Sequence, residues 1–500
     1  MSPSRRDFIR FIVAGSVAAG CPVELSLLAA PSPTTPQVEG EHFELCHKVR
    51  DGHRFPRQRV WRRPDVVIVG GGVGGLSAAY FLQEYDFLLL EKEAHWGGNA
   101  YLEEYEGQAY ATGSAFEFAG GAGDLLAQEL GLKLLPVNSP DPTIVNGVFV
   151  EDTWRSGLDQ LPYPASVRAG FKKFRNRLLR MDVEKQATAL DNESFARYTA
   201  GYPPQVRQWW DAYGPSNWGA STENTSAMVG IEALQSLAGD EPDSRVTLPG
   251  GLGAVTKRLA EVLLPQHRER MYTDVTVVAV EPLQREVEVT YVQQGALRTV
   301  AAKAVIMATP KFITARIVAG IPPTQKSAMR KLRYAPYPVV NIILDRPVYN
   351  RAYDTWAPGK AFTDVIVADW VVRKQFGDQP KDNILTFYTP LRESDRLRLM
   401  TEPGSRELAS AVLRDFQGLL PEFRVDPVEV HIYRRGHPMF AATPGTYSRL
   451  IPAARRPMRR VFFANTDSQG PESLTSGAIE VSRRGAEWLK KLLSSRPARR

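Results

Sequence analysis

The sequence predicts an α/β fold: a parallel sheet with covering helices, assembled from separate segments of the chain, and an α+β domain inserted between them. Three observations support this prediction. A strand, glycine turn, helix and second strand follow one another over residues 65–91. A strand-rich stretch covers residues 272–308, and a helical, aromatic-rich block lies between them at residues 165–239. Alternating strand and helix patterns of this kind are typical of α/β domains.

The composition is that of a globular protein. The chain has 500 residues, 43% hydrophobic and 23% charged, which excludes a disordered or fibrous chain and leaves room for two or three domains. Its net charge of +7 comes partly from arginines near the two ends. Because no nucleic-acid-binding motif accompanies them, we expect no nucleic-acid partner.

The first 30 residues predict a twin-arginine export signal. Arg5 and Arg6 lie in the motif SRRDFIR, and a weakly apolar run over residues 11–20 is too short to span a bilayer. The alternative is a basic N-terminal helix of the mature protein. The signal implies a periplasmic or other extracytoplasmic protein that is exported folded. Cys21 lies in a poor lipobox, so membrane association is expected only if Cys21 is lipidated, and the soluble outcome is favoured.

The rest of the chain divides into two domains behind an N-terminal arm. Residues 31–62 are expected to be a linker and arm, because residues 31–40 are rich in Pro and Thr without apolar periodicity. The parallel-sheet domain is expected to comprise residues 63–150, 245–320 and 455–495. The inserted domain, which would bind the substrate, comprises residues 151–244 and 321–454.

The glycines after the first strand form a dinucleotide-binding motif. The apolar strand at residues 65–69 runs directly into the sequence GGGVGG, which includes Gly74, and a helical segment follows. Gly70 permits the tight turn, Gly72 lets the backbone approach a pyrophosphate, and Gly75 lets the helix pack closely on the strand. The helix N-terminus would face the phosphates.

An acidic residue completes the motif. The second strand ends in Glu91, 21 positions after Gly70, where a carboxylate accepts hydrogen bonds from ribose hydroxyls. GxGxxG alone is a weak signal, but strand, glycines, helix, strand and acid together are specific. The sequence therefore predicts a Rossmann-type dinucleotide site.

The residues after Glu91 resemble the flavin amine oxidase superfamily. That superfamily carries an acid followed shortly by Gly-Gly, and this chain has Lys92, Gly97, Gly98 and Asn99 at those places. The resemblance implies that these residues bind FAD and that the fold is amine oxidase-like. Residues 248–253 and 304–310 agree with it, and it assigns Val277 to packing on the adenine.

The C-terminal segment supports the same resemblance. Residues 461–467 read VFFANTD, where most of the superfamily has Ala-Gly-Asp or Ala-Gly-Glu. This variant resembles bacterial spermidine dehydrogenase-like proteins and implies that Asp467 contacts the flavin. Gly477 and Ala478 would begin a helix whose N-terminus faces the polar edge of the flavin.

The resemblance implies an FAD-dependent oxidoreductase that takes a hydride from a small substrate, with an amine favoured. Thr446 stands where monoamine oxidases carry the cysteine of their covalent flavin link, so the FAD is expected to be non-covalent. Two catalytic candidates follow. Tyr447 would flank the flavin face, although a packed core tyrosine is an equal alternative, and Arg316 aligns with the family's lysine.

A haem is a second possible cofactor. His42, His47 and His53 are three of the seven histidines, and some bacterial spermidine dehydrogenases bind haem as well as FAD, so the resemblance makes His47 a candidate axial ligand. A solvated loop is the favoured alternative. We expect no other metal site, because the chain has two cysteines, no CxxC and no HExxH.

Two other functions stay open. The chain could be an FAD-dependent desaturase or isomerase of an apolar, lipid-like substrate, or a non-catalytic flavin-binding redox protein. The only support for a lipid is an aromatic cluster at residues 209–218, which a packed helix also explains. An acidic cavity lining would favour a cationic amine. The electron acceptor could be oxygen, a quinone or a cytochrome.

Overall fold

The computed structural model describes residues 34–239, 242–376, 383–421, 424–470 and 475–494. The export motif with Arg5 and Arg6, and Cys21, lie outside the described residues. From Thr35 onwards the chain forms one unit. Among the described residues, no helix has the length and apolar character needed to cross a membrane.

A five-stranded parallel sheet forms the first domain. Its order is β11-β3-β2-β15-β23, with bounds Met271–Tyr272, Phe87–Leu90, Val66–Val69, Ala304–Met307 and Val461–Phe463. The three central strands are buried throughout, which explains their continuous apolar sequences. The sheet draws on widely separated parts of the chain, as the discontinuous α/β prediction requires.

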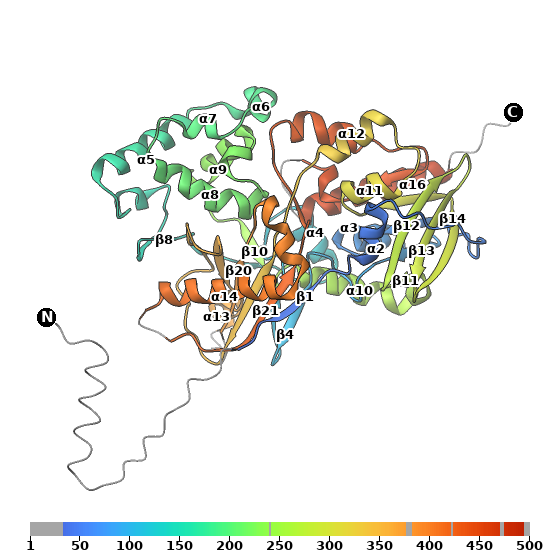
Figure 1. Cartoon of the computed structure of the whole chain (residues 1–500), viewed down its shortest axis with the longest axis horizontal. Coiled ribbons are helices and arrows are strands. Elements are labelled where there is room, and N and C mark those ends of the chain that lie inside the picture. Colours follow the sequence, from blue (N-terminus) through green and yellow to red (C-terminus); the bar gives the residue numbers. More distant parts are fainter. Residues whose placement is uncertain (1–33, 240–241, 377–382, 422–423, 471–474, 495–500) are drawn as a thin grey trace, which may run out of the picture. The chain divides into compact units, whose positions relative to one another are not determined.

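Helices cover one face of this sheet and a β-meander covers the other. The helices are α3 (Val73–Phe81), α4 (Ala122–Glu129), α10 (Gly253–His267) and α16 (Thr475–Ser494), and they share one apolar core with β2 and β3. The meander consists of β12 (Val275–Pro282), β13 (Val287–Gln293) and β14 (Ala296–Ala302), with Gly295 in the turn at φ 77°. Figure 1 shows this domain on the right.

An eight-stranded sheet forms the second domain. Its order is β1-β21-β17-β20-β19-β18-β8-β9, with bounds Gln37–Gly40, Pro427–Arg434, Val339–Leu344, Asn383–Tyr388, Asp364–Val367, Asp354–Trp356, Thr143–Val145 and Val148–Val150. One face carries apolar residues such as Val340, Ile342 and Phe387, which share a core with Phe416 of α14 (Glu402–Leu419). The opposite face, which we call the polar face, carries polar side chains such as Asn341 and Thr386 together with a few apolar ones such as Ile343.

Two segments belong to a different part of the fold from the one that the sequence predicts. Strands β8 and β9 belong to the eight-stranded sheet, although residues 63–150 were assigned to the parallel-sheet domain. Gln37–Gly40, within the expected linker, pairs in parallel with β21. Backbone hydrogen bonds alone satisfy an open sheet edge, so this strand needs no apolar alternation.

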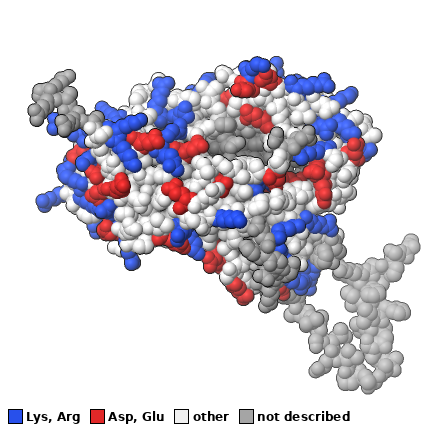
Figure 2. All heavy atoms as spheres, turned by 180° about the vertical axis from the view of Figure 1, so that it is seen from behind, with Lys and Arg blue, Asp and Glu red and all other residues white. Residues whose placement is uncertain are grey.

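A helical lobe sits on the eight-stranded sheet and contains the aromatic cluster. It consists of α5 (Ala165–Leu178), α6 (Val183–Asp191), α7 (Ala196–Thr199), α8 (Pro204–Trp218) and α9 (Ala227–Ala238), at the upper left of Figure 1. Trp209 and Trp210 of α8 are 5% and 1% exposed and pack against Trp154 and Phe174. The cluster is therefore internal packing. On the molecular face in Figure 2, acidic and basic side chains are interspersed.

Candidate functional site

The glycine turn after β2 is dictated by close backbone packing. Gly70 has φ 104°, and a Cβ added to it would lie 2.8 Å from the Ala308 carbonyl oxygen. A Cβ at Gly75 would lie 1.7 Å from the Gly70 carbonyl oxygen, and one at Gly74 would lie 2.6 Å from the Ala464 carbonyl oxygen. These glycines let α3 start directly above the ends of three parallel strands.

Close packing does not explain the glycine at position 72. Its φ is −73°, which any residue can adopt, and an added Cβ would meet no atom nearer than 3.8 Å. Neither backbone conformation nor packing within the protein requires a glycine here. The position leaves open space beside the N-terminus of α3, where no side chain caps the first N–H groups. This cradle fits the pyrophosphate of a dinucleotide.

Glu91 lies at the end of β3, next to the cradle, and is buried. Its Oε2 accepts a hydrogen bond from the Gly71 N–H at 2.5 Å, and its Oε1 accepts one from the Glu93 N–H at 2.8 Å. Burial raises the pKa of this carboxyl above its ordinary value. Each carboxylate oxygen can accept a second hydrogen bond, so the carboxylate can also bind ribose hydroxyls. Lys92 pairs with Glu93.

The second glycine pair is joined to the first. The Gly97 N–H donates to the Gly71 carbonyl at 2.9 Å, and Gly97 and Gly98 have φ 118° and 58°. Asn99 donates from Nδ2 to the Pro438 carbonyl at 2.8 Å, which connects this loop to the segment after β21.

The other residues that the resemblance assigned to FAD lie around the same sheet end. Val277 lies on β12, whose first residue donates its N–H to the Glu91 carbonyl at 2.8 Å. Gly477 and Ala478 lie buried in the first turn of α16, and α16 packs on α3 through a hydrogen bond from Ser482 Oγ to the Gly74 carbonyl at 2.7 Å. The residues present therefore fit FAD: α3 would hold its pyrophosphate and Glu91 its ribose.

Asp467 makes contacts that the sequence did not predict. Its Oδ1 accepts from Lys311 Nζ at 2.7 Å, and its Oδ2 accepts from the Lys311 N–H at 2.7 Å and the Tyr334 hydroxyl at 2.6 Å. Both side chains of the ion pair are 0% exposed. Protein groups thus occupy both carboxylate oxygens. The sequence signal that could have pointed to Lys311 is its position four residues after the returning strand β15.

The two catalytic candidates lie among different neighbours. Tyr447 lies on η5 (Thr446–Leu450), half-buried, and its ring packs against that of Phe440 at 6.4 Å between centroids. Arg316, on α11 (Lys311–Ile317), donates to the Arg50 carbonyl at 3.3 Å, at the edge of α2 (Glu44–Arg50). Nothing in these contacts joins the two residues into one site.

His47 lies on α2 and contacts the ring of Phe43 at 4.9 Å between centroids. Within the described part of the chain, no group of three or more His, Cys, Asp and Glu side chains is placed to hold a metal ion.

The polar face of the eight-stranded sheet is turned towards the parallel-sheet domain. Tyr388 donates from its hydroxyl to the Gly113 carbonyl at 2.6 Å, and Asn341 donates from Nδ2 to the Ala111 carbonyl at 3.2 Å. The segment that accepts these bonds is itself joined to the second glycine pair, since the Ser114 N–H donates to the Asn99 carbonyl at 3.2 Å. This face therefore lies next to the loop that would hold the flavin.

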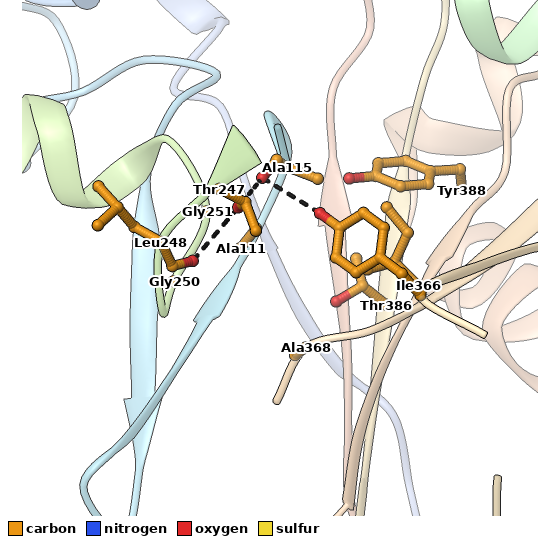
Figure 3. A pocket seen from close by; sticks show the side chains of 11 residues that line it. Ala111, Ala115, Thr247, Leu248, Gly250, Gly251, Ile366, Ala368, Thr386 and Tyr388 are labelled. Atoms are coloured by element: carbon orange, nitrogen blue, oxygen red, sulfur yellow. Dashed lines mark hydrogen bonds between the residues drawn. The ribbon is translucent and has the colours of Figure 1, made fainter. Parts of the chain in front are cut away.

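A small cavity separates the two domains at this point. Figure 3 shows Ala111, Ala115, Thr247 and Gly251 on one side, and Ile366, Thr386 and Tyr388 on the other. The cavity measures about 10 Å³, room for about one water molecule.

Two aspartates lie on the same sheet face as the cavity lining. Asp354 is paired across the strands with Ile366, and Asp364 is paired with Tyr388, so their side chains share a face with these cavity-lining residues. Asp354 and Asp364 are 4% and 2% exposed. Sequence reasoning missed both, because they belong to no motif and come together only through strand register.

Neither of these two carboxyl groups is paired directly with a cation. Arg245, the nearby guanidinium, pairs with Asp141 at 2.6 Å and Asp243 at 2.9 Å. Among the residues that the structure describes, neither Asp354 nor Asp364 forms an ion pair, and Asp354 Oδ1 has no hydrogen-bond partner. Burial raises the pKa of Asp364 to about 7 and that of Asp354 well above its ordinary value.

The fold and the cradle define a dinucleotide-binding protein, and comparison with known proteins gives its family. Residues 73–489 match the family model for flavin-containing amine oxidoreductases. The chain belongs to this family and is an FAD-dependent oxidoreductase.

Among curated proteins, the chain resembles the oxidoreductase PigB of Serratia sp. (strain ATCC 39006). The two are 23% identical over 506 residues, which cover 83% of this chain and 73% of the relative.

Solved structures show the same fold. Wild-type putrescine oxidase bound to putrescine matches with a TM-score of 0.67 at 17% identity, covering 86% of this chain and 99% of that one. Cyclohexylamine oxidase from Brevibacterium oxydans IH-35A matches with a TM-score of 0.66 at 19% identity, covering 86% and 100%. The amine oxidase-like α/β fold predicted from the sequence is thereby confirmed.

Proposed function

We propose that this enzyme oxidises a small amine, with transfer of a hydride from the carbon next to nitrogen to non-covalent FAD. The observation that carries the proposal is the pair of buried carboxyl groups without an ion-pair partner, Asp354 and Asp364, on the sheet face beside the flavin loop. When bound, FAD accepts the hydride. The protein's part is to attract the ammonium group and hold its carbon in place.

The electrostatics favour a cation over an apolar substrate. A buried carboxylate without a partner is costly, and an entering ammonium group supplies both the opposite charge and N–H donors. An apolar, lipid-like substrate would leave Asp354 Oδ1 unpaired. The names of two solved relatives, putrescine oxidase and cyclohexylamine oxidase, point to amines as well.

Two further parts of the proposal have narrower support. Non-covalent binding rests on Thr446, which cannot form a thioether with the flavin. Export of the folded protein by the twin-arginine route rests on the N-terminal motif alone. The electron acceptor stays open between oxygen, a quinone and a cytochrome.

The test is anaerobic flavin bleaching with matched substrates. The purified, FAD-loaded protein is mixed in separate samples with 1,4-diaminobutane, cyclohexylamine, cyclohexanol or an apolar polyene. Cyclohexanol has the shape of cyclohexylamine without its nitrogen. We expect an amine to bleach the flavin and cyclohexanol to leave it oxidised. Bleaching by an apolar polyene alone would instead establish the desaturase function. If none of these compounds bleaches the flavin, the result would instead support a non-catalytic flavin-binding redox protein.

Substitutions test the role of the aspartates. Asp354→Asn and Asp364→Asn keep the side-chain shape and remove the charge, so we expect the fold to persist and the KM for the amine to rise about tenfold or more. Asp345→Asn is the matched control, because Asp345 is 63% exposed. Equal KM values in all three variants would contradict the proposed role.

A further inference from the structure

The N-terminal arm, residues 35–63, reaches across both domains. At its start, β1 pairs with β21 of the eight-stranded sheet, with Gly40 opposite Arg434. At its end, the Gln58 N–H donates to Thr299 Oγ1 at 2.9 Å and the Trp61 N–H donates to the Thr299 carbonyl at 3.2 Å, both on β14. The family match begins at residue 73, so the arm precedes the matched residues.

The middle of the arm lies at the ribose end of the FAD cradle. The His42 N–H donates to the Glu93 carboxylate at 3.2 Å, and His42 Nδ1 lies 3.3 Å from the same group. The Glu93 N–H in turn donates to Glu91, the ribose-binding acid. Helix α2 then packs against β12, the strand that carries Val277, and against α11. In Figure 1, α2 is the dark-blue helix beside β12.

The environment of Cys46 shows how close α2 lies to the FAD cradle. Burial raises the pKa of its thiol, and the charged groups that act on it include Lys92 and Glu91 of the cradle and Glu41 of the arm. Cys46 therefore lies close enough to the cradle for the charges of Lys92 and Glu91 to act on its thiol. It is the one cysteine within the described part of the chain.

We propose that the arm forms the outer wall of the FAD site at its adenosine end, with α2 closing over the ribose. In a family member without the covalent cysteine, this wall retains the cofactor mechanically: FAD leaves only when the arm detaches from one of its two anchors. The inference depends on FAD binding and not on the identity of the substrate.

The first experiment uses the arm's own cysteine as a reporter. In the full chain with Cys21→Ser, Cys46 is labelled with a maleimide, with FAD bound and after FAD removal. We expect bound FAD to slow labelling about tenfold or more, because the arm must open for the reagent to reach the thiol. A chain with Cys46→Ser and Ser394→Cys, whose new thiol is on the surface, should label equally in both states. FAD-independent labelling of Cys46 would overturn the proposal.

The second experiment weakens an anchor away from the cofactor. Arg57 pairs with Glu288 at 2.5 Å, and Trp61 Nε1 donates to the Tyr291 hydroxyl at 3.1 Å, both on β13. We expect the Arg57→Ala/Trp61→Ala double variant to release FAD about tenfold faster, measured by recovery of flavin fluorescence. Arg54→Ala, on an exposed part of the same arm, is the matched control. Faster Cys46 labelling without faster FAD release would contradict the retaining role.

Discussion

Lys311 and Asp467 form an ion pair from which solvent is fully excluded: Nζ lies 2.7 Å from Oδ1, and both side chains are 0% exposed. Burial lowers the pKa of Lys311. The pair joins the residues that follow β15 to those that follow β23, two neighbouring strands of the parallel sheet. It therefore fixes the loops at the end of the sheet where the flavin cradle lies.

Breaking this pair should destabilise the fold severely. Lys311→Met leaves the Asp467 carboxylate buried without its cation, so we expect the free energy of unfolding to fall by about 3–5 kcal/mol. The double variant Lys311→Met/Asp467→Asn should recover part of that loss. Denaturant unfolding of the FAD-loaded protein measures both. Lys303→Met is the control, since the Lys303–Asp65 pair is exposed and should contribute no more than about 1 kcal/mol. Equal losses for Lys311→Met and Lys303→Met would refute the prediction.

Gly72 should affect cofactor binding without affecting folding. Because an added Cβ would meet no protein atom nearer than 3.8 Å, Gly72→Ala should unfold at nearly the same temperature as the wild-type apoprotein. Its methyl group would project into the cradle, and we expect the Kd for FAD to rise about tenfold or more. Flavin fluorescence titration gives the Kd.

Gly75→Ala is the contrasting variant, because its Cβ would collide with the Gly70 carbonyl, and it should reduce the yield of folded protein. An unchanged Kd in Gly72→Ala would show that the pyrophosphate does not approach this backbone.

Asp364 should make the protein less stable as the pH rises. Burial raises its pKa from 3.8 to about 7 in the folded state, so the unfolded chain releases this proton first. Its contribution to stability is full below pH 3.8 and is lost as the pH rises towards about 7. The nearby carboxyl groups of Asp354 and Asp141 strengthen this loss of stability with rising pH, whereas the positive charge of Arg245 weakens it.

The measurement compares melting temperatures between about pH 5 and about pH 8, without amine. We expect Asp364→Asn to show a smaller decrease over this range than the wild type, and Asp345→Asn to follow the wild type. A decrease of the same size in Asp364→Asn would mean that other groups cause it.

The tryptophans of α8 should matter for stability and not for substrate choice. Trp210 is 1% exposed and packs among Trp154, Phe174 and Phe195, so Trp210→Ala should reduce the free energy of unfolding by about 3–5 kcal/mol. The relative rates with 1,4-diaminobutane and cyclohexylamine should stay the same. A changed preference would place the cluster in the substrate channel.

The order of the local elements around the glycine turn could be predicted from the sequence. The first strand, the glycine turn, α3, the strand Phe87–Leu90 and Glu91 come in the predicted order, because strand propensity and glycine spacing are properties of neighbouring residues. The fold class followed from the same segments.

What the sequence could not supply depends on register between distant strands. Asp354 and Asp364 share a face only because β18 and β19 pair with a particular offset, and Lys311 meets Asp467 across 156 positions of the chain. Strand β1 was missed for the same reason, since its role is set by the open edge of β21. Asp467 was recognised as a residue of interest, but its partners were not.

The order of strands in the parallel sheet also constrains when the protein can acquire its cofactor. Strand β23 and helix α16, which complete the sheet and pack against α3, come from the last segments of the described chain. During synthesis, the glycine turn can be held against its final neighbours only after α16 has left the ribosome. The complete cradle therefore depends on residues that lie 408 positions apart in the chain, as the hydrogen bond from Ser482 to Gly74 shows.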